Sequence, residues 1–116
     1  APSPFLAIII GAVGGIIVFF GTGLLLRLKI DDVVGAIPVH GFAGIFGTLV
    51  VPLSNSAASF GIQLYGILWI NIFVFIVAFV VWYLMKITVG IRISEEAEKL
   101  GTDKAEVGVM AYSIRD

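Results

Sequence analysis

The fold of this chain is decided by residues 33–85, which read VVGAIPVHGFAGIFGTLVVPLSNSAASFGIQLYGILWINIFVFIVAFVVWYLM. These 53 residues contain no Asp, Glu, Lys or Arg, and they include the only histidine of the chain, His40. A soluble domain of this size cannot cover so long an apolar stretch, whereas a lipid bilayer can. The stretch therefore indicates a membrane protein, and an ionisable ring inside it is by default a candidate for function.

The composition of the whole chain agrees with a membrane setting. Apolar residues make up 59% of the 116 residues and charged residues only 13%, and the mean hydropathy is +1.12. No basic patch supports nucleic-acid binding. The lack of cysteine excludes disulfides and thiolate metal sites. Because the sequence offers no nucleophile with a base and no metal cluster, we expect no enzymatic activity and no cofactor.

Three apolar runs predict an all-α membrane protein. A helix needs about 20 apolar residues to cross a bilayer core of about 30 Å. The uncharged runs lie at 5–26, 33–53 and 62–85, and small polar residues at 54–59 indicate a loop between the second and third. We assign residues 1–87 to the transmembrane region and 88–116 to a polar tail. Since the chain lacks an initiator Met and a signal-peptide pattern, we expect a piece of a longer protein.

The positions of Lys and Arg set the expected orientation in the membrane. Arg27 and Lys29 follow the first run, and Lys86 and Arg92 follow the third, while the loop between the second and third runs is uncharged. Basic residues favour the cytoplasmic side. We therefore expect the first linker and the tail to be cytoplasmic.

Glycines in the first two runs predict close helix packing. Their spacing is every fourth residue at Gly11 and Gly15 and every third residue at Gly41, Gly44 and Gly47. Small residues let helix backbones approach and gain van der Waals contact. The alternative is that these glycines make room for a pore.

Two amide side chains interrupt the third run. Gln63 lies near its outer end, where we expect contact with water. Asn71 lies deeper, and we expect it to form an interhelical hydrogen bond. A contact with substrate is the alternative for Asn71.

His40 is the main candidate for a functional residue. Pro38, two residues earlier, removes a backbone donor, and membrane helices tolerate such breaks where neighbours or a cavity satisfy the freed groups. A neutral imidazole presents one donor and one acceptor, which suits a small polar solute or a proton relay. The alternative is a histidine hydrogen-bonded to a neighbouring helix, with no solute passing it. One histidine alone is a poor metal site.

Two carboxylates, Asp31 and Asp32, stand at the start of the second run. Carboxylates at a helix start cap free N–H groups and complement the helix dipole. The alternative is that they attract cations to the mouth of a pore. The sequence leaves both roles open.

These stretches together resemble the ammonium transporter family (Amt/Mep, related to the Rh proteins). Residues 28–32 (LKIDD), 35–41 (GAIPVHG) and 44–49 (GIFGTL) are similar to the family's tenth helix. Residues 88–96 (TVGIRISEE), 101–103 (GTD) and 111–112 (AY) are similar to its cytoplasmic tail. The resemblance covers nearly the whole chain. It implies that the three runs are helices nine, ten and eleven of an eleven-helix protomer.

The resemblance also implies a function, which is a channel or transporter for ammonium or ammonia. Family members are homotrimers in the plasma (inner) membrane, and each protomer has a narrow hydrophobic pore with two histidines near its middle. By resemblance, His40 is the second of them. A dry pore rejects bare cations because their desolvation is costly, whereas neutral ammonia passes. The cytoplasmic tail contacts neighbouring protomers and, in many prokaryotes, a PII-type regulator.

The tail departs from the family pattern. The family commonly has His-Gly-Glu shortly before Ala-Tyr, and this chain has Val107-Gly108-Val109 instead. The departure leaves gating and regulator binding open, and it motivates one alternative, an ammonium sensor that drives a downstream signalling domain. A structural membrane subunit without conduction is a further alternative. Ser94 and Gly101 still predict a short helix between a cap and a glycine stop.

Overall fold

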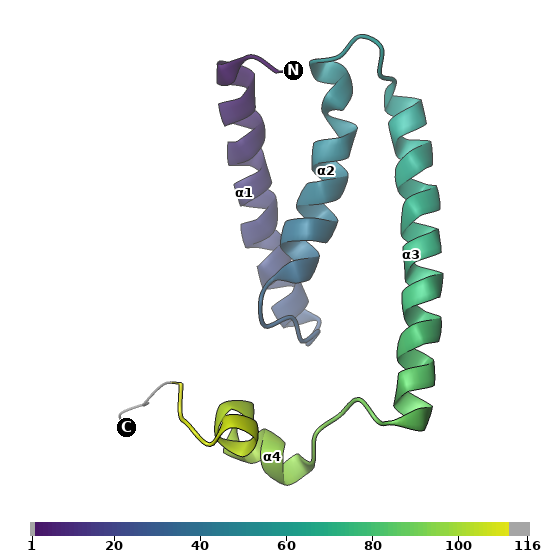
Figure 1. Cartoon of the computed structure of the whole chain (residues 1–116). Helices are drawn as coiled ribbons and strands as arrows, with labels where there is room; N and C mark the ends of the chain where they lie inside the picture. Colours follow the sequence, from purple (N-terminus) through teal and green to yellow (C-terminus); the bar gives the residue numbers. More distant parts are fainter. Residues whose placement is uncertain (1, 112–116) are drawn as a thin grey trace. The chain divides into compact units, whose positions relative to one another are not determined.

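The computed structural model describes residues 2–111, and its regular elements are helices (Figure 1). In chain order they are α1 (Pro4–Arg27), the π-helix η1 (Ile37–Phe42), α2 (Ala43–Leu49), the 3-10 turn η2 (Val51–Leu53), α3 (Phe60–Thr88), α4 (Glu95–Leu100) and the π-helix η3 (Asp103–Val107). The chain divides into two units, one up to Val74 and the other from Phe75 onward. The helix α3 contributes to both units.

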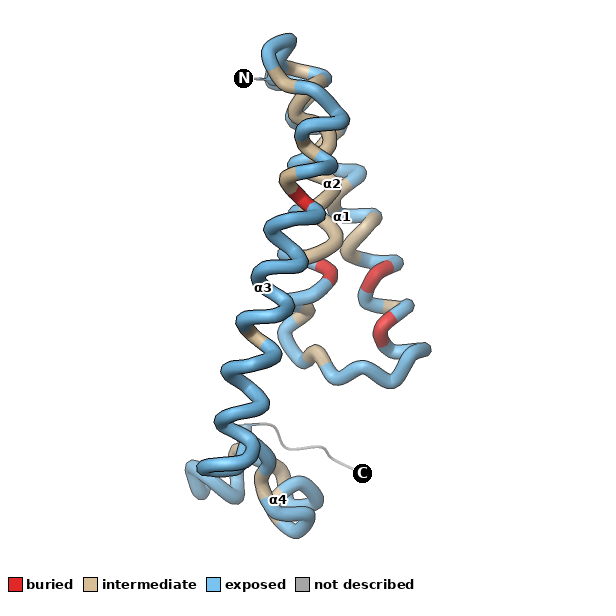
Figure 2. Tube along the Cα trace, turned by 90° about the vertical axis from the view of Figure 1, so that its right-hand side faces the viewer, coloured by how far each residue is buried: buried red, intermediate tan, exposed pale blue. Residues whose placement is uncertain are grey.

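Two of the described helices, α1 and α3, are long and apolar enough to cross a membrane. They have 24 and 29 residues, and they contain the runs predicted at 5–26 and 62–85. Their large apolar side chains are mostly exposed, whereas Leu25 and Ile67 are buried (Figure 2). An apolar surface of this extent requires lipid or further helices around it. The chain is therefore a membrane protein.

The second apolar segment differs from the prediction of one helix over 33–53. Its helical part begins only at Ile37 and ends at Leu53, and it passes from π-helix to α-helix to a 3-10 turn. The reason lies just upstream, because Gly35 has a φ of +69°, a left-handed conformation that ends any regular helix from Val33. At about 1.5 Å per residue, residues 37–53 reach roughly 25 Å, which is less than the ~30 Å of a bilayer core.

The first unit is held together where α1 meets η1. Gly21 is buried there, and a Cβ atom built on it would lie 2.6 Å from Cδ2 of Phe42 and 3.2 Å from Cβ of Pro38. Pro38 is itself fully buried. Only a glycine at position 21 lets α1 approach this closely without displacing the ring. The close packing predicted from glycines therefore occurs at a glycine that the spacing did not single out.

The glycines that the spacing did single out face open space in the described structure. An added Cβ would meet no atom within 4 Å at any of the following positions: Gly11, Gly15, Gly44 and Gly47. At Gly41 the nearest such atom is Cγ2 of Ile37, in the same helical segment, at 3.8 Å. Close packing at these glycines does not occur within the described residues, and packing against other helices of a longer protein stays a prediction.

The second unit contains the tail. As predicted, α4 begins after Ser94, whose Oγ accepts a hydrogen bond from the Ala97 N–H at 3.2 Å. It ends at Gly101, which has a φ of +96°. Beyond it, the Asp103 carboxylate accepts a hydrogen bond from the Ala111 N–H at 2.7 Å and closes a small loop. The last residue of the Ala-Tyr motif, Tyr112, lies outside the described residues.

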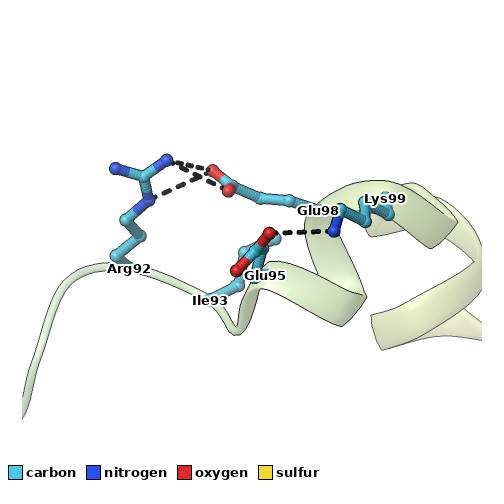
Figure 3. Close-up of a pocket in the computed structure, with 5 residues that line it drawn as sticks. All are labelled: Arg92, Ile93, Glu95, Glu98 and Lys99. Carbon is cyan, nitrogen blue, oxygen red and sulfur yellow. Dashed lines mark hydrogen bonds and ion pairs between the residues drawn. The ribbon is translucent and has the colours of Figure 1, made fainter.

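Two ion pairs involve side chains of α4 (Figure 3). The Arg92 guanidinium donates to both oxygens of Glu98, at 3.0 Å each, and Lys99 contacts Glu95 at 2.8 Å. The hydrogen-bonded Glu98 raises the pKa of Arg92. In the neighbouring loop, the Ala111 N–H lowers the pKa of Asp103. All four side chains of the ion pairs are exposed, so each pair contributes little to stability.

Candidate functional site

The strongest candidate site is a groove beside His40, which lies wholly in the first unit and has a volume of about 400 Å³. One wall comes from η1 and α2 and the other from α3. The lining residues are His40, Gly41, Gly44, Ile45 and Thr48 on the first wall and Gln63, Gly66, Ile67, Ile70 and Asn71 on the second. Glycines on both walls leave room between the helices.

The start of η1 places His40 in this groove. The two oxygens of Asp32 accept hydrogen bonds from the backbone N–H groups of Ala36 and Ile37, both at 2.8 Å. Pro38 then packs against α1, and His40 lines the groove. Helical segments of the π type are frequent at functional sites, because the wider turn re-aims a side chain. His40 is exposed among the described residues.

The two carboxylates at this end have different surroundings. Both oxygens of Asp32 are engaged in capping, whereas its neighbour Asp31 is exposed. Together with Thr22 and Pro38 they line a second, smaller cavity of about 290 Å³. The geometry shows that Asp32 caps the backbone N–H groups at the start of η1. A role at a pore mouth stays a prediction for both carboxylates.

The hydrogen bonds of the polar side chains in the groove differ from those that the sequence predicts. Asn71 donates from Nδ2 to the carbonyl of Ile67 at 2.8 Å, within its own helix. The cross-helix bond belongs instead to Gln63, which donates from Nε2 to the carbonyl of Thr48 at 3.1 Å. Within the described residues the Asn71 amide nitrogen thus bonds in its own helix, and an interhelical bond of Asn71 in the whole protein stays a prediction. The longer glutamine side chain bridges the helices, whereas the short asparagine reaches the carbonyl one turn back.

Sequence reasoning did not connect the α3 wall with His40, although a signal for it exists. Residues 63, 66, 67, 70 and 71 follow the pattern i, i+3, i+4, i+7, i+8, so they share one face of a helix. That face joins two amides and a glycine in an otherwise apolar helix. The spacing does not show that this face lies opposite α2, because that pairing depends on the loop at 54–59.

The arrangement suits the binding of a small polar solute. Ile45, Ile67 and Ile70 provide apolar walls, and His40 offers one donor and one acceptor when neutral. A hydrated ion would have to lose water to enter such walls, which is costly unless the polar groups replace the lost bonds.

Comparison with known proteins identifies the family of the chain. Residues 1–112 match the model of the Ammonium Transporter Family. A putative ammonium transporter of Synechocystis sp. is 42% identical over 104 residues, which are 88% of this chain and 24% of that protein. The ammonium transporter Amt2 of Archaeoglobus fulgidus is 34% identical over 130 residues, 94% of this chain and 28% of that protein. An ammonium transporter of Bacillus subtilis is 33% identical over 126 residues, 95% of this chain and 31% of that protein.

No solved structure matches the chain at comparable significance. The chain spans only 24–31% of the length of these three relatives. The family match nevertheless extends over residues 1–112 and includes the whole groove. This chain therefore belongs to the ammonium transporter family.

Proposed function

We propose that this chain forms part of a conduction route for ammonium or ammonia, in which His40 contacts the passing solute. The observation that carries the proposal is the position of His40 in a groove between two helical walls of a membrane protein of this family. The groove combines apolar walls with a few polar groups, as small-molecule sites generally do.

The proposed route favours neutral ammonia over bare cations. Ammonia is small, gives and accepts hydrogen bonds, and is complemented by a neutral imidazole. A cation without its water pays a large desolvation cost among the isoleucines of the groove. His40 thus replaces part of the hydration that the solute loses.

The remaining features of the proposal concern the whole protein. Because the chain spans a quarter to a third of its relatives, other helices of an eleven-helix protomer complete the route. We place three crossings here, with residues 37–53 as the second one. The tail and the linker with Arg27 and Lys29 face the cytoplasm of a plasma (inner) membrane. A homotrimer and a PII-type regulator at the tail are the proposed partners, beside the lipid bilayer.

Substitution of His40 in the full-length parent tests the proposal. We expect His40→Ala to lower methylammonium uptake about tenfold, the effect of losing a hydrogen bond of about 1.4 kcal/mol to the solute. Val39→Ala is the matched control, because Val39 lies in the same π-helical turn but does not line the groove. An unchanged rate and selectivity in His40→Ala would remove His40 from the mechanism.

Two observations on the parent gene separate this proposal from its alternatives. A reading frame that continues past Asp116 into a kinase or cyclase domain would favour an ammonium sensor. A parent without a second histidine in a matching upstream helix would favour a structural subunit.

A further inference from the structure

We propose that Gly21 of α1 is a positioning residue for the site, because its contact with η1 fixes the turn that carries His40. The inference rests on the function proposed for His40. It goes beyond that function because it assigns a part in transport to α1, and the lining described for the groove comes from η1, α2 and α3.

The contact between Gly21 and η1 leaves no room for a larger residue. Gly21 is buried, and a Cβ atom built on it would lie 2.6 Å from Cδ2 and 3.1 Å from Cε2 of Phe42. The same atom would lie 3.2 Å from Cβ of Pro38, which is fully buried. Carbon atoms that are not bonded to one another prefer separations of about 3.5–4.0 Å. A methyl group at position 21 therefore displaces the ring of Phe42, the turn of η1, or both.

The side chains that meet α1 and the imidazole lie on opposite faces of η1. Pro38 and Phe42 are four positions apart, and both lie next to Gly21, so they share one face. His40 is two positions from each of them, which is roughly half of a helical turn of about 3.6 residues. On its own face it lines the groove whose other wall is α3. Displacement of η1 away from α1 therefore moves the imidazole.

The turn around His40 is held at both of its ends. At the start, Asp32 accepts hydrogen bonds from two backbone N–H groups, at 2.8 Å each, and the ring of Pro38 fixes its own φ. At the end, the Ala43 N–H donates to the carbonyl of Pro38 and closes the wide π-type turn. Because the turn is closed by these bonds, a displacement at its α1 face is passed on to His40.

Uptake by the full-length parent, normalised to the amount of protein in the membrane, tests the inference. We expect Gly21→Ala to lower methylammonium uptake about tenfold, as His40→Ala does, because the displaced imidazole loses its hydrogen bond to the solute. Gly23→Ala is the matched control in the same helix, since a Cβ atom there meets no atom within 4 Å, and it should leave uptake unchanged. Equal losses in the two variants would overturn the inference.

A second substitution at the contact should rescue the first. Phe42→Leu combined with Gly21→Ala is expected to recover part of the lost uptake, because the smaller side chain leaves room for the methyl group. No recovery would mean that the contact with Phe42 does not cause the loss, and the inference would be wrong.

The double variant with Gly21→Ala and His40→Ala distinguishes positioning from a general loss of structure. Effects of residues that act through one another do not add, whereas those of independent residues do. We expect the double variant to transport at the rate of His40→Ala alone, because the group through which Gly21 acts is already missing. A further fall in the double variant would overturn the positioning role.

The same variants separate this inference from the function on which it rests. If Gly21→Ala leaves uptake unchanged while His40→Ala lowers it, the positioning role is wrong and the proposed function stands. If His40→Ala is itself silent, the proposed function fails and the inference fails with it.

A replacement at Phe42 decides the matter if Gly21→Ala does not reach the membrane. Phe42→Ala removes the ring that rests on Gly21, so uptake should fall in the parent, and it should fall no further in the His40→Ala background. Normal uptake in Phe42→Ala, or an additional fall in the His40→Ala background, overturns the inference.

Discussion

Gly21 of α1 and Phe42 of η1 are in such close contact that a methyl group on Gly21 would lie 2.6 Å from Cδ2 of the ring. Pro38 meets the same point from the same helical turn, at 3.2 Å. The turn that carries His40 is thus fixed against α1 on one side, while His40 lines the groove beside α3. The spacing of glycines did not reveal this contact, because one glycine in an apolar helix has no periodic signature.

We expect Gly21→Ala to destabilise the packing of α1 against η1 by about 1–3 kcal/mol, the usual cost of overpacking. The ring of Phe42 has to move away, because the new methyl group would lie 2.6 Å from its Cδ2 and also 3.2 Å from Cβ of Pro38. Denaturant unfolding of the chain in detergent micelles measures the loss. Phe42→Leu in the same chain should restore part of it, because the smaller side chain leaves room for the methyl group.

Gly23→Ala is the control for this substitution. An added Cβ at Gly23 meets no atom within 4 Å, so only the helix preference of alanine acts. That preference stabilises a helix by up to about 1 kcal/mol. Equal effects of Gly21→Ala and Gly23→Ala would show that the contact with Phe42 does not limit the packing.

A second prediction concerns Asp32, which holds the N–H groups of Ala36 and Ile37 at 2.8 Å. We expect Asp32→Ala to cost about 0.5–2 kcal/mol, as the loss of a helix cap does. Amide hydrogen exchange at Ala36 and Ile37 should accelerate, because both lose their acceptor. Asp32→Asn retains an acceptor oxygen and should be milder.

The neighbouring Asp31 is the control, and it also tests the alternative role at a pore mouth. Asp31→Ala should leave the exchange of Ala36 and Ile37 unchanged. If Asp31→Ala and Asp32→Ala reduced uptake by the parent equally, attraction of cations by both charges would explain their presence better than capping does.

The sequence predicts the parts of this structure that depend on composition and local caps. Long apolar runs led directly to α1 and α3, and Ser94 and Gly101 led to α4. Such features need no knowledge of distant contacts, since the cost of leaving backbone groups unpaired in lipid enforces a helix.

The parts that escaped prediction depend on contacts between elements. The late start at Ile37 follows from one left-handed glycine, Gly35, combined with the cap from Asp32. The cross-helix bond of Gln63 and the local bond of Asn71 follow from side-chain length and from the pairing of α2 with α3. Periodicity shows which residues share a face, but it does not show what that face meets.

A third prediction concerns the pH response of the tail loop. The Ala111 N–H lowers the pKa of Asp103, so the bond favours the folded loop above the ordinary aspartate pKa of about 3.9 and is lost as the pH falls through the lowered value. We expect the Ala111 amide signal in NMR spectra to shift upfield over that acidic range. Asp103→Asn should abolish the titration of this signal, whereas Glu106→Gln should preserve it. A signal that titrates identically in Asp103→Asn would contradict the assignment.

The last prediction concerns salt and the ion pair between Arg92 and Glu98, in which Nη2 donates to both carboxylate oxygens at 3.0 Å and Nε donates to Oε1 at 3.2 Å. Both side chains are exposed, at 79% and 41%, so ions reach the pair freely. At 1 M salt the screening length falls to about 3 Å, and we expect the Arg92 Nε–H signal in NMR spectra to lose its hydrogen-bonded shift. Glu98→Gln should give the same shift at low salt, while α4 persists because Ser94 still caps it. Loss of α4 in Glu98→Gln would mean that this pair, and not the cap, maintains the helix.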